Sequence, residues 1–299
     1  MTYYHLDPNT AAERLAKELE RARGYRVLRA LPTIEQIWCR SMPLPTKTIT
    51  LGVLDTETTG LDPTDHKMIE LALAKLTICA AAGDVVNVGP ATSWLEDPGV
   101  PLTPEIEALT GLTDAELAGQ QFDEGEIARA LANVDVIVAH NAAFDLRFFR
   151  QRFPGLRYPW ACSMTEIDWP AHGLGGVGNN VSGLLTSAGH YVAHAHRAGP
   201  DAWALLCLLA MPASEGRAIA AHLVQKAKRP SARLFADRAP FELKDRLKAA
   251  GYRWSPLERA WWTEGEPERM ANEATWLTSL HPAVRPRTVA VDWYSRHLG

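Results

Sequence analysis

The stretch Thr48-Ile-Thr-Leu-Gly-Val-Leu-Asp55-Thr-Glu57 decides the fold of this chain. Its apolar run is typical of a buried β-strand, and the run ends in two carboxylates. Residues two apart in a strand face the same side, so Asp55 and Glu57 point together from the strand end. Two carboxylates this close repel each other unless a cation lies between them. Thr58-Thr-Gly-Leu61 then turns the chain sharply, and this placement favours a functional site over surface charge.

Two further segments place a carboxylate at the start of a helix. His140-Asn-Ala-Ala-Phe-Asp145 follows the short apolar strand expected at 134–139, and His196-Arg-Ala-Gly-Pro-Asp201 opens an apolar helix. Each carboxylate taken alone could be a helix cap or a partner of the helix dipole. A lone histidine is more often a structural residue than a catalyst. The occurrence of all three segments in one chain favours a shared site.

Together, these segments resemble the three motifs of the DEDDh 3′→5′ exonucleases, which include the proofreading epsilon subunit of bacterial DNA polymerase III and the related ribonuclease T. The matching motifs are Asp55-x-Glu57, His140-Asn-Ala-x-Phe-Asp145, and His196 five residues before Asp201. The resemblance covers residues 49–212 and extends to the turns at 56–61 and 109–113. It implies a ribonuclease H-like α/β exonuclease domain, in which a mixed sheet is flanked by helices.

The resemblance also implies hydrolysis of a phosphodiester with two metal ions. Two divalent cations about 4 Å apart can activate water and stabilise the leaving oxygen. Oxygen ligands alone suit Mg²⁺ or Mn²⁺ rather than zinc. Asp55 would bridge both ions, Glu57 and Asp201 would complete the first site, and Asp145 would hold the second. His196 would be the general base, since an ordinary histidine pKa of about 6.5 suits proton removal near neutral pH.

By the same resemblance, one set of residues would hold the terminal nucleotide: Thr58, Thr59, Gly60, Leu61, Thr110, His140, Asn141 and Phe144. Backbone groups of Thr59 would grip the 3′-hydroxyl, while Leu61 and Phe144 would press on the base and sugar. Contacts of this kind read shape and stacking, so they imply weak sequence preference. For Phe144 the alternative is packing in the core. His194 lacks the required spacing to Asp201 and is interpreted as a loop residue.

Charge and composition divide the chain into three parts. Residues 49–212 hold 8 Lys and Arg against 20 Asp and Glu, whereas residues 213–299 hold 15 against 10 and residues 1–48 hold 8 against 5. The acidic segment 49–212 attracts a polyanion only if bound cations reverse its local electric field. The basic segments on either side of it would therefore supply the attraction for phosphate groups. We therefore predict an N-terminal extension with a linker, an exonuclease domain, and a basic C-terminal module.

Periodicity predicts the elements within these parts. In the extension we expect a helix over 8–24 and a strand over 25–31 that adds to the edge of either domain. In the exonuclease domain we expect strands at 48–55, 68–80, 85–95 and 134–139. Helices are expected from the caps Thr103 and Thr113 and over 124–131, 143–153, 181–188 and 200–209.

The C-terminal module is rich in tryptophan, with five of the chain's ten. It is predicted to contain a strand at 233–237, a helix over 240–251, a hairpin and a closing helix over 266–280, and it looks like small modules appended to DNA-processing enzymes. Basic residues interleaved with aromatic ones suit a platform for a nucleic-acid strand. The candidate contacts are Lys244, Lys248, Arg253, Trp254 and Arg259. The alternative is that the tryptophans form the module's own core.

The bulk composition is that of a soluble globular protein, with 46% apolar and 22% charged residues. No apolar run approaches the about 20 residues that a membrane span needs. The four cysteines form no C-x-x-C pair, which favours buried thiols in a reducing compartment. These features predict a cytoplasmic protein without a membrane partner.

The sequence therefore predicts a metal-dependent 3′→5′ exonuclease that releases nucleoside 5′-monophosphates from single-stranded DNA, in repair, proofreading or clean-up. One alternative is the same chemistry on RNA or short oligonucleotides, because the sequence does not show how the site treats a 2′-hydroxyl. Another is an idle protein that binds nucleic-acid ends, although such a binder has no need for four convergent carboxylates. The expected partners are single-stranded 3′ ends, with DNA favoured over RNA, and a polymerase or other DNA-processing protein. The oligomeric state stays open.

Overall fold

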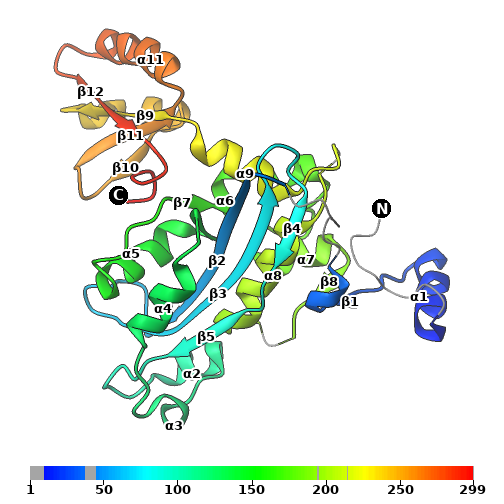
Figure 1. Ribbon diagram of the computed structural model, residues 1–299. Helices are drawn as coiled ribbons and strands as arrows, with labels where there is room; N and C mark the ends of the chain where they lie inside the picture. The colour runs from blue at the N-terminus through cyan, green and yellow to red at the C-terminus, as the bar shows by residue number, and fades with distance from the viewer. Residues whose placement is uncertain (1–9, 38–44, 194, 214, 299) are drawn as a thin grey trace. The chain divides into compact units, whose positions relative to one another are not determined.

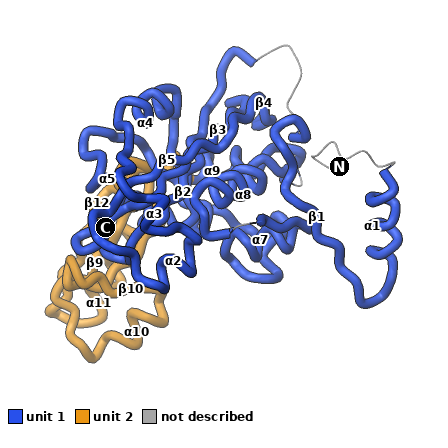
Figure 2. Tube along the Cα trace, turned by 90° about the horizontal axis from the view of Figure 1, so that it is seen from below, with its two compact units in different colours: residues 1–226 blue, residues 227–299 orange. Residues whose placement is uncertain are grey.

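The computed structural model describes residues 10–37, 45–193, 195–213 and 215–298. The chain forms two compact units, residues 1–226 and residues 227–299 (Figure 2). Helix α9 (Ile219–Lys228) runs through the junction between them. The second unit thus begins at Ala227, whereas composition placed a boundary after residue 212.

A six-stranded mixed sheet organises the first unit (Figure 1). Its strands are β2 (Thr48–Thr58), β3 (Met68–Cys79), β4 (Val85–Val88), β5 (Thr92–Leu95), β6 (Val136–Ala139) and β7 (Trp160–Cys162). The order is β4-β3-β2-β6-β7, and β5 also pairs with β3. β2, β3 and β4 pair antiparallel, whereas β6 and β7 add in parallel on the other side of β2. This topology confirms the predicted ribonuclease H-like sheet.

The single strand predicted at 85–95 was wrong, because the structure divides it into β4 and β5. Gly89, Pro90 and Ala91 separate the two strands. Proline has no N–H to donate to a strand ladder, so pairing stops there and resumes at Thr92. β7 was not predicted, since three residues carry too little periodicity.

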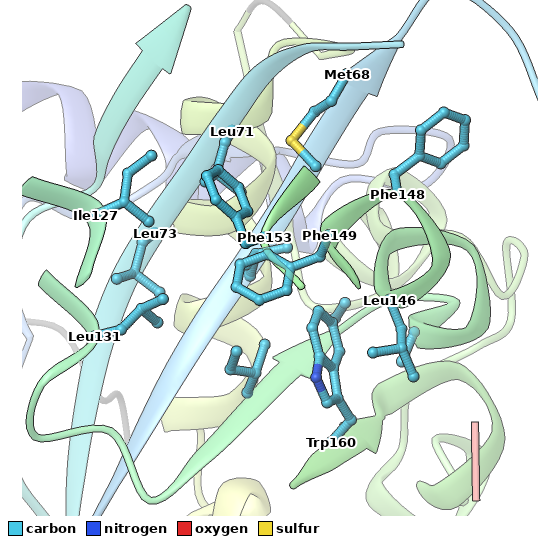
Figure 3. Close-up of a cluster of buried hydrophobic side chains, with 14 of the residues drawn as sticks. Met68, Leu71, Leu73, Ile127, Leu131, Leu146, Phe148, Phe149, Phe153 and Trp160 are labelled. Atoms are coloured by element: carbon cyan, nitrogen blue, oxygen red, sulfur yellow. The ribbon is translucent and has the colours of Figure 1, made fainter. Parts of the chain in front are cut away.

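Helices cover both faces of the sheet. On one face, α4 (Glu124–Leu131) and α5 (Ala142–Arg152) contribute to the apolar cluster in Figure 3. Within it, the ring of Phe149 lies 5.1 Å from that of Phe153 and 5.6 Å from that of Trp160. The other face is covered by α8 (Ala198–Ala210), which packs on β2 and β3. Both faces are thus buried, which explains the nearly continuous apolar runs of the central strands.

Side-chain caps fix the start of several helices, and those at Thr103 and Thr113 were predicted. Thr103 accepts a hydrogen bond at the start of α2 (Pro104–Thr110), and Thr113 does so for α3 (Asp114–Leu117). Asp123 plays this part for α4 and Asn180 for α7 (Val181–Ser187). A short α6 (Ser163–Glu166) follows β7. Each cap satisfies an N–H that has no partner within its helix.

The N-terminal segment adds to the first unit. α1 (Ala11–Arg21) lies within the helix predicted over 8–24, whose first two residues are outside the described ranges. β1 (Arg29–Ala30) pairs in parallel with β8 (His190–Tyr191). Arg29 also forms ion pairs with Glu13 and Glu20 of α1. The strand predicted at 25–31 therefore exists in shortened form and joins the exonuclease part of the chain.

The second unit is a four-stranded antiparallel sheet with two helices on it. Its elements are β9 (Ser231–Asp237), α10 (Lys244–Ala249), β10 (Arg253–Ser255), β11 (Ala260–Gly265), α11 (Pro267–Leu280) and β12 (Arg285–Val291), and the strand order is β10-β11-β9-β12. Leu234, Leu247 and Met270 form part of its core, against which Trp261 and Trp276 pack. The unit is the small α+β module expected from the sequence.

Within the described ranges, no helix is both long and apolar enough to cross a bilayer. Cys79, Cys162 and Cys207 are buried thiols. Cys39 lies outside the described residues.

Small residues bring the first turn of α8 close to the sheet. Ala198 and Ala202 pack against Ala72 of β3 in a buried cluster. A Cβ atom added to Gly199 would lie only 2.7 Å from Ser93 Oγ, so a larger residue there would push the helix away. Ala72 pairs with Asp55 across the β2–β3 ladder. The close contact therefore brings the start of α8 to the strand end that carries the carboxylates.

Replacing Ala202 by leucine should force α8 away from β3. Overpacking of this kind costs about 1–3 kcal/mol, measurable as a lower free energy of unfolding in urea. Ala115→Leu on the exposed surface of α3 is the matched control and should change it by less than about 0.5 kcal/mol. Equal stability of both variants would show that the contact is not tightly packed.

Candidate active site

Three carboxylates from two elements meet at the end of β2. Asp55 and Glu57 of β2 and Asp201 of α8 each offer one oxygen, and these oxygens lie within 4.8 Å of one another. Alternation along the strand puts Asp55 and Glu57 on one face, and α8 covers that face. All three side chains are partly buried. This arrangement can hold a divalent cation.

Asp145 approaches the same strand end from another helix. It lies in the first turn of α5, is 3% exposed, and accepts a hydrogen bond of 2.8 Å from Thr56 Oγ1. Thr56 stands between Asp55 and Glu57 in the sequence and therefore faces the other side of the strand. Asp145 is thus outside the group of three, although its charge contributes to raising the pKa of Asp55.

Burial raises the pKa of all four carboxyl groups of the site, and repulsion by neighbouring carboxylates adds to the effect at Asp55, Glu57 and Asp201. Burial, with the negative charges of Asp145, Glu57 and Asp201, raises the pKa of Asp55 well above its ordinary value. Burial, with the charges of Asp201 and Glu70, raises the pKa of Glu57 to about 8. Burial raises the pKa of Asp145 to about 7 and also raises that of Asp201. A bound cation would offset this repulsion and keep the groups ionised at neutral pH.

The two oxygens of Asp201 have different surroundings. Oδ2 accepts a hydrogen bond of 2.9 Å from the backbone N–H of His196. Oδ1 is buried and has no hydrogen-bond partner among the described residues. A buried carboxylate oxygen without a partner is costly, and buried polar atoms normally have one. A cation between Asp201, Asp55 and Glu57 would supply it, so the residues fit a divalent metal.

His196 stands on a strained and exposed turn before α8. Its backbone φ is 66°, a region that residues other than glycine seldom adopt. The hydrogen bond to Asp201 holds this backbone in place, while the side chain is exposed to solvent. His196, the fifth predicted catalytic residue, is thus linked by a hydrogen bond to Asp201 of the three-carboxylate cluster. His194 lies outside the described residues.

A buried ion pair, which the sequence analysis missed, holds this turn against the sheet. Glu70 of β3 is 1% exposed and pairs with Glu57 across the ladder. Its carboxylate accepts from Arg197 Nε at 3.0 Å and from the backbone N–H of Ala198 at 3.2 Å. These contacts fasten the residues between His196 and Asp201. A glutamate within the apolar run of β3 was the signal that could have identified it.

The turn after β2 is held by local hydrogen bonds. Thr58 Oγ1 donates to Gly60 O at 2.6 Å, and Thr59 N–H donates to Lys67 O at 2.9 Å. A Cβ atom at Gly60 would lie 2.5 Å from the His66 ring, so a larger residue would require that ring to move. The N–H of Thr59 is therefore already engaged. Leu61 follows with 78% of its surface exposed.

Both ring nitrogens of His140 lie within hydrogen-bonding distance of other groups of the protein. His140 Nδ1 lies 2.8 Å from Ser163 Oγ, and its Nε2 lies 2.7 Å from Asn179 O. Burial lowers the pKa of His140, so the ring is neutral at physiological pH. The exposed Asn141 takes a left-handed backbone with φ of 77° at the start of α5. Both nitrogens of His140 are thus occupied, and nothing in the sequence pointed to Ser163.

Two other residues predicted to contact substrate have structural partners. The ring of Phe144 is half-buried and lies 5.1 Å from that of Phe148. Thr110 is buried, and its hydroxyl donates to Ile106 O and accepts from Leu112 N–H at the end of α2. Their contacts with a nucleotide remain predictions.

Residues 53–162, from β2 to the end of β7, match the model of the RNase_T exonuclease family. This part of the chain is similar to the RNase_T exonuclease domain. The match includes Asp55, Glu57 and Asp145, while His196 and Asp201 lie beyond it. The predicted resemblance to this group of exonucleases is confirmed for these residues.

Two relatives and one solved structure are similar to part of this chain. A DNA polymerase III PolC-type protein of Halalkalibacterium halodurans is 39% identical over 103 residues, which are 34% of this chain and 7% of that protein. A DNA polymerase III subunit epsilon-like protein of Rhodobacter capsulatus is 34% identical over 112 residues, 36% of this chain and 15% of that protein. The chain thus matches a small part of each relative's length. A structure of exonuclease X in complex with 5′-overhanging duplex DNA is 25% identical, with a TM-score of 0.39, and covers 54% of this chain and 89% of that one.

Stabilisation by Mg²⁺ should grow with pH. Because the folded-state pKa values of Glu57 and Asp145 are raised to about 8 and 7, the metal-free protein loses stability as the pH rises through these values. A cation binds the ionised carboxylates, so the Tm difference between Mg²⁺ and EDTA should be larger at pH 8.5 than at pH 5.5. Differential scanning fluorimetry measures it. A difference that does not depend on pH would contradict the assignment.

Replacing Arg197 by methionine should leave the Glu70 carboxylate buried without its guanidinium partner. We expect the free energy of unfolding to fall by about 1–3 kcal/mol. The double variant Glu70→Leu with Arg197→Met should lose less than the two single changes together, because neither charge is then stranded. Urea unfolding of all four proteins measures this coupling. Additive losses would show that the pair is not coupled.

Proposed function

We propose that this protein is a 3′→5′ exonuclease that requires divalent cations and releases nucleoside 5′-monophosphates from single-stranded DNA. The observation that carries the proposal is the group of Asp55, Glu57 and Asp201, in which a buried Asp201 oxygen has no hydrogen-bond partner. The exonuclease domain supplies the reaction class. Oxygen ligands alone favour Mg²⁺ or Mn²⁺.

The carboxylates divide into two ligand sets. Asp55, Glu57 and Asp201 would hold one cation, and Asp55 with Asp145 would hold the second. When bound, the two cations activate water and stabilise the charge on the leaving oxygen. Thr56 keeps Asp145 oriented toward the strand end through its hydroxyl hydrogen bond. The protein's own task is to hold four anionic groups in position before the substrate arrives.

His196 would act as the general base. Its imidazole is exposed, so a ring nitrogen can take a proton from the attacking water and pass it to solvent. The hydrogen bond from the His196 backbone N–H to Asp201 fixes the position of the backbone that carries this ring. His140 is a poor alternative, because both of its nitrogens already have partners.

The turn after β2 would receive the 3′ end. Leu61 is an exposed apolar side chain and would pack on the last base, with Phe144 beside it. The hydrogen bond from the Thr58 hydroxyl to Gly60 O, and the close packing of Gly60 against His66, keep the turn rigid. Packing of this kind is independent of base identity, so weak sequence preference follows. Because the relatives are named as parts of DNA polymerase III, we favour DNA over RNA as the substrate. For the same reason, the proposed partner is a polymerase or other DNA-processing protein.

The test uses matched 5′-labelled single-stranded DNA and RNA with Mg²⁺ or Mn²⁺. We expect a ladder of DNA shortened from the 3′ end, and a loss of rate of at least about 100-fold in Glu57→Gln, Asp201→Asn and His196→Ala. Glu105→Gln, an exposed residue on α2, is the matched control and should retain the wild-type rate.

Release of the label as a mononucleotide without a ladder would overturn the polarity, and faster loss of RNA would overturn the substrate. Intact DNA and RNA under every metal condition would overturn the proposal as a whole, and full activity of Asp201→Asn would remove the metal assignment.

A further inference from the structure

The second unit exposes aromatic side chains that its own core does not use. Phe241 is 79% exposed and Trp254 is 50% exposed. Trp254 lies on β10, which among the described strands is at the edge of the sheet and pairs with β11. Large exposed aromatic side chains that gather in one place mark an interaction surface in a soluble protein.

These rings are linked by two lysines into one surface. Trp254 lies opposite Trp261 in the β10–β11 ladder, with ring centroids 5.7 Å apart. Lys248 Nζ lies 5.9 Å from the centre of the Trp261 ring, and Lys244 Nζ lies 4.6 Å from that of Phe241. The two lysines are one turn apart on α10 and so share a face of that helix. We call Phe241, Lys244, Lys248, Trp254 and Trp261 the aromatic–lysine platform.

The charge of the platform is not neutralised locally. Residues 227–299 hold 13 Lys and Arg against 9 Asp and Glu. Arg287, for example, forms ion pairs with Asp237 and Glu258. Across the described part of this unit, neither Lys244 nor Lys248 forms an ion pair with a carboxylate. Their ammonium groups contact aromatic rings instead, so they remain able to bind an anion.

We propose that the aromatic–lysine platform binds single-stranded nucleic acid, with unpaired bases stacked on the rings and phosphates on the lysines. Stacking and phosphate contacts occur together in proteins that bind single strands without reading their sequence. In a duplex the base faces are covered by stacking on the neighbouring base pairs, so a duplex cannot use the exposed rings. The platform belongs to the second unit and contains none of the carboxylate ligands, so it is a binding site in addition to the proposed catalytic centre.

The structure separates the residues that the sequence grouped in this module. Lys244, Lys248 and Trp254 belong to the platform. The guanidinium of Arg253 lies 4.3 Å from the Trp262 ring centre, and Trp262 alternates with Trp261 along β11, so Arg253 lies on the other face of the sheet. Arg259 follows in the β10–β11 turn with a φ of 50°. Only the residues of the platform enter the proposal.

The test measures binding of a fluorescent 15-nucleotide oligothymidylate to the full chain in EDTA, by anisotropy at several salt concentrations. The double variant Phe241→Ala with Trp254→Ala should raise Kd by at least about tenfold, because each stacked base contributes strongly to affinity. Leu257→Ala is the matched control, since Leu257 is 82% exposed in the same unit and is not part of the platform. It should keep the wild-type Kd.

A second pair of variants tests the lysines. Lys244→Gln with Lys248→Gln should lower the slope of log Kd against log salt by about 1.4, given about 0.7 for each phosphate contact on a single strand. Lys226→Gln, an exposed lysine in the first unit, should leave the slope unchanged. A duplex of the same length should bind with the same Kd to wild type and to the aromatic double variant.

Binding and catalysis can fail separately in this design. The p-nitrophenyl ester of thymidine 5′-monophosphate has a single base and no strand for the platform to bind, so both platform variants should hydrolyse it at the wild-type rate in Mn²⁺. Wild-type affinity in correctly folded platform variants, judged by circular dichroism, would overturn the platform. Equal loss of single-strand and duplex binding would also overturn it, because stacking would then not be the cause. The absence of ester hydrolysis in wild type, with strand binding intact, would count against the catalytic proposal alone.

Discussion

The repulsion among carboxylates at the end of β2 is the constraint on which the rest of the exonuclease domain depends. Two unit negative charges 4 Å apart repel by about 4 kcal/mol at an effective dielectric constant of about 20. Oxygens of Asp55, Glu57 and Asp201 lie within 4.8 Å of one another, with Asp145 and Glu70 nearby. Burial, together with this repulsion, raises the pKa of Glu57 to about 8. The surrounding structure keeps the carboxylates together, and a bound cation would offset their repulsion.

Neighbouring contacts each hold one carboxylate in place. Small residues at the start of α8 let Asp201 come close to β2. The Glu70–Arg197 ion pair holds the turn that precedes Asp201. Thr56 forms a hydrogen bond with Asp145 on the other side of the strand. Such preorganisation is what hydrolysis of an anionic diester requires, because the groups need not move as charge develops. The second unit adds an aromatic surface suited to the strand itself.

Much of the fold could be predicted, because the signals were local. Apolar runs located β2 and β3, and caps such as Thr113 fixed helix starts. The catalytic candidates followed from their spacing and from resemblance. The Glu70–Arg197 pair and the Ser163 contact with His140 join residues 127 and 23 positions apart, and no local pattern reveals such pairs. The face of the sheet on which Arg253 lies likewise depends on strand register.

Direct binding of Mn²⁺ tests the central claim that Asp55, Glu57 and Asp201 form one cation site. Electron paramagnetic resonance detects unbound Mn²⁺, so titrating the wild-type protein at pH 7.5 measures how much of the ion is bound. The account predicts strong depletion of the free signal by wild type and little by Asp201→Asn, with the fold of the variant confirmed by circular dichroism. Equal depletion by both proteins would contradict it, because the buried oxygen of Asp201 would then not be a ligand.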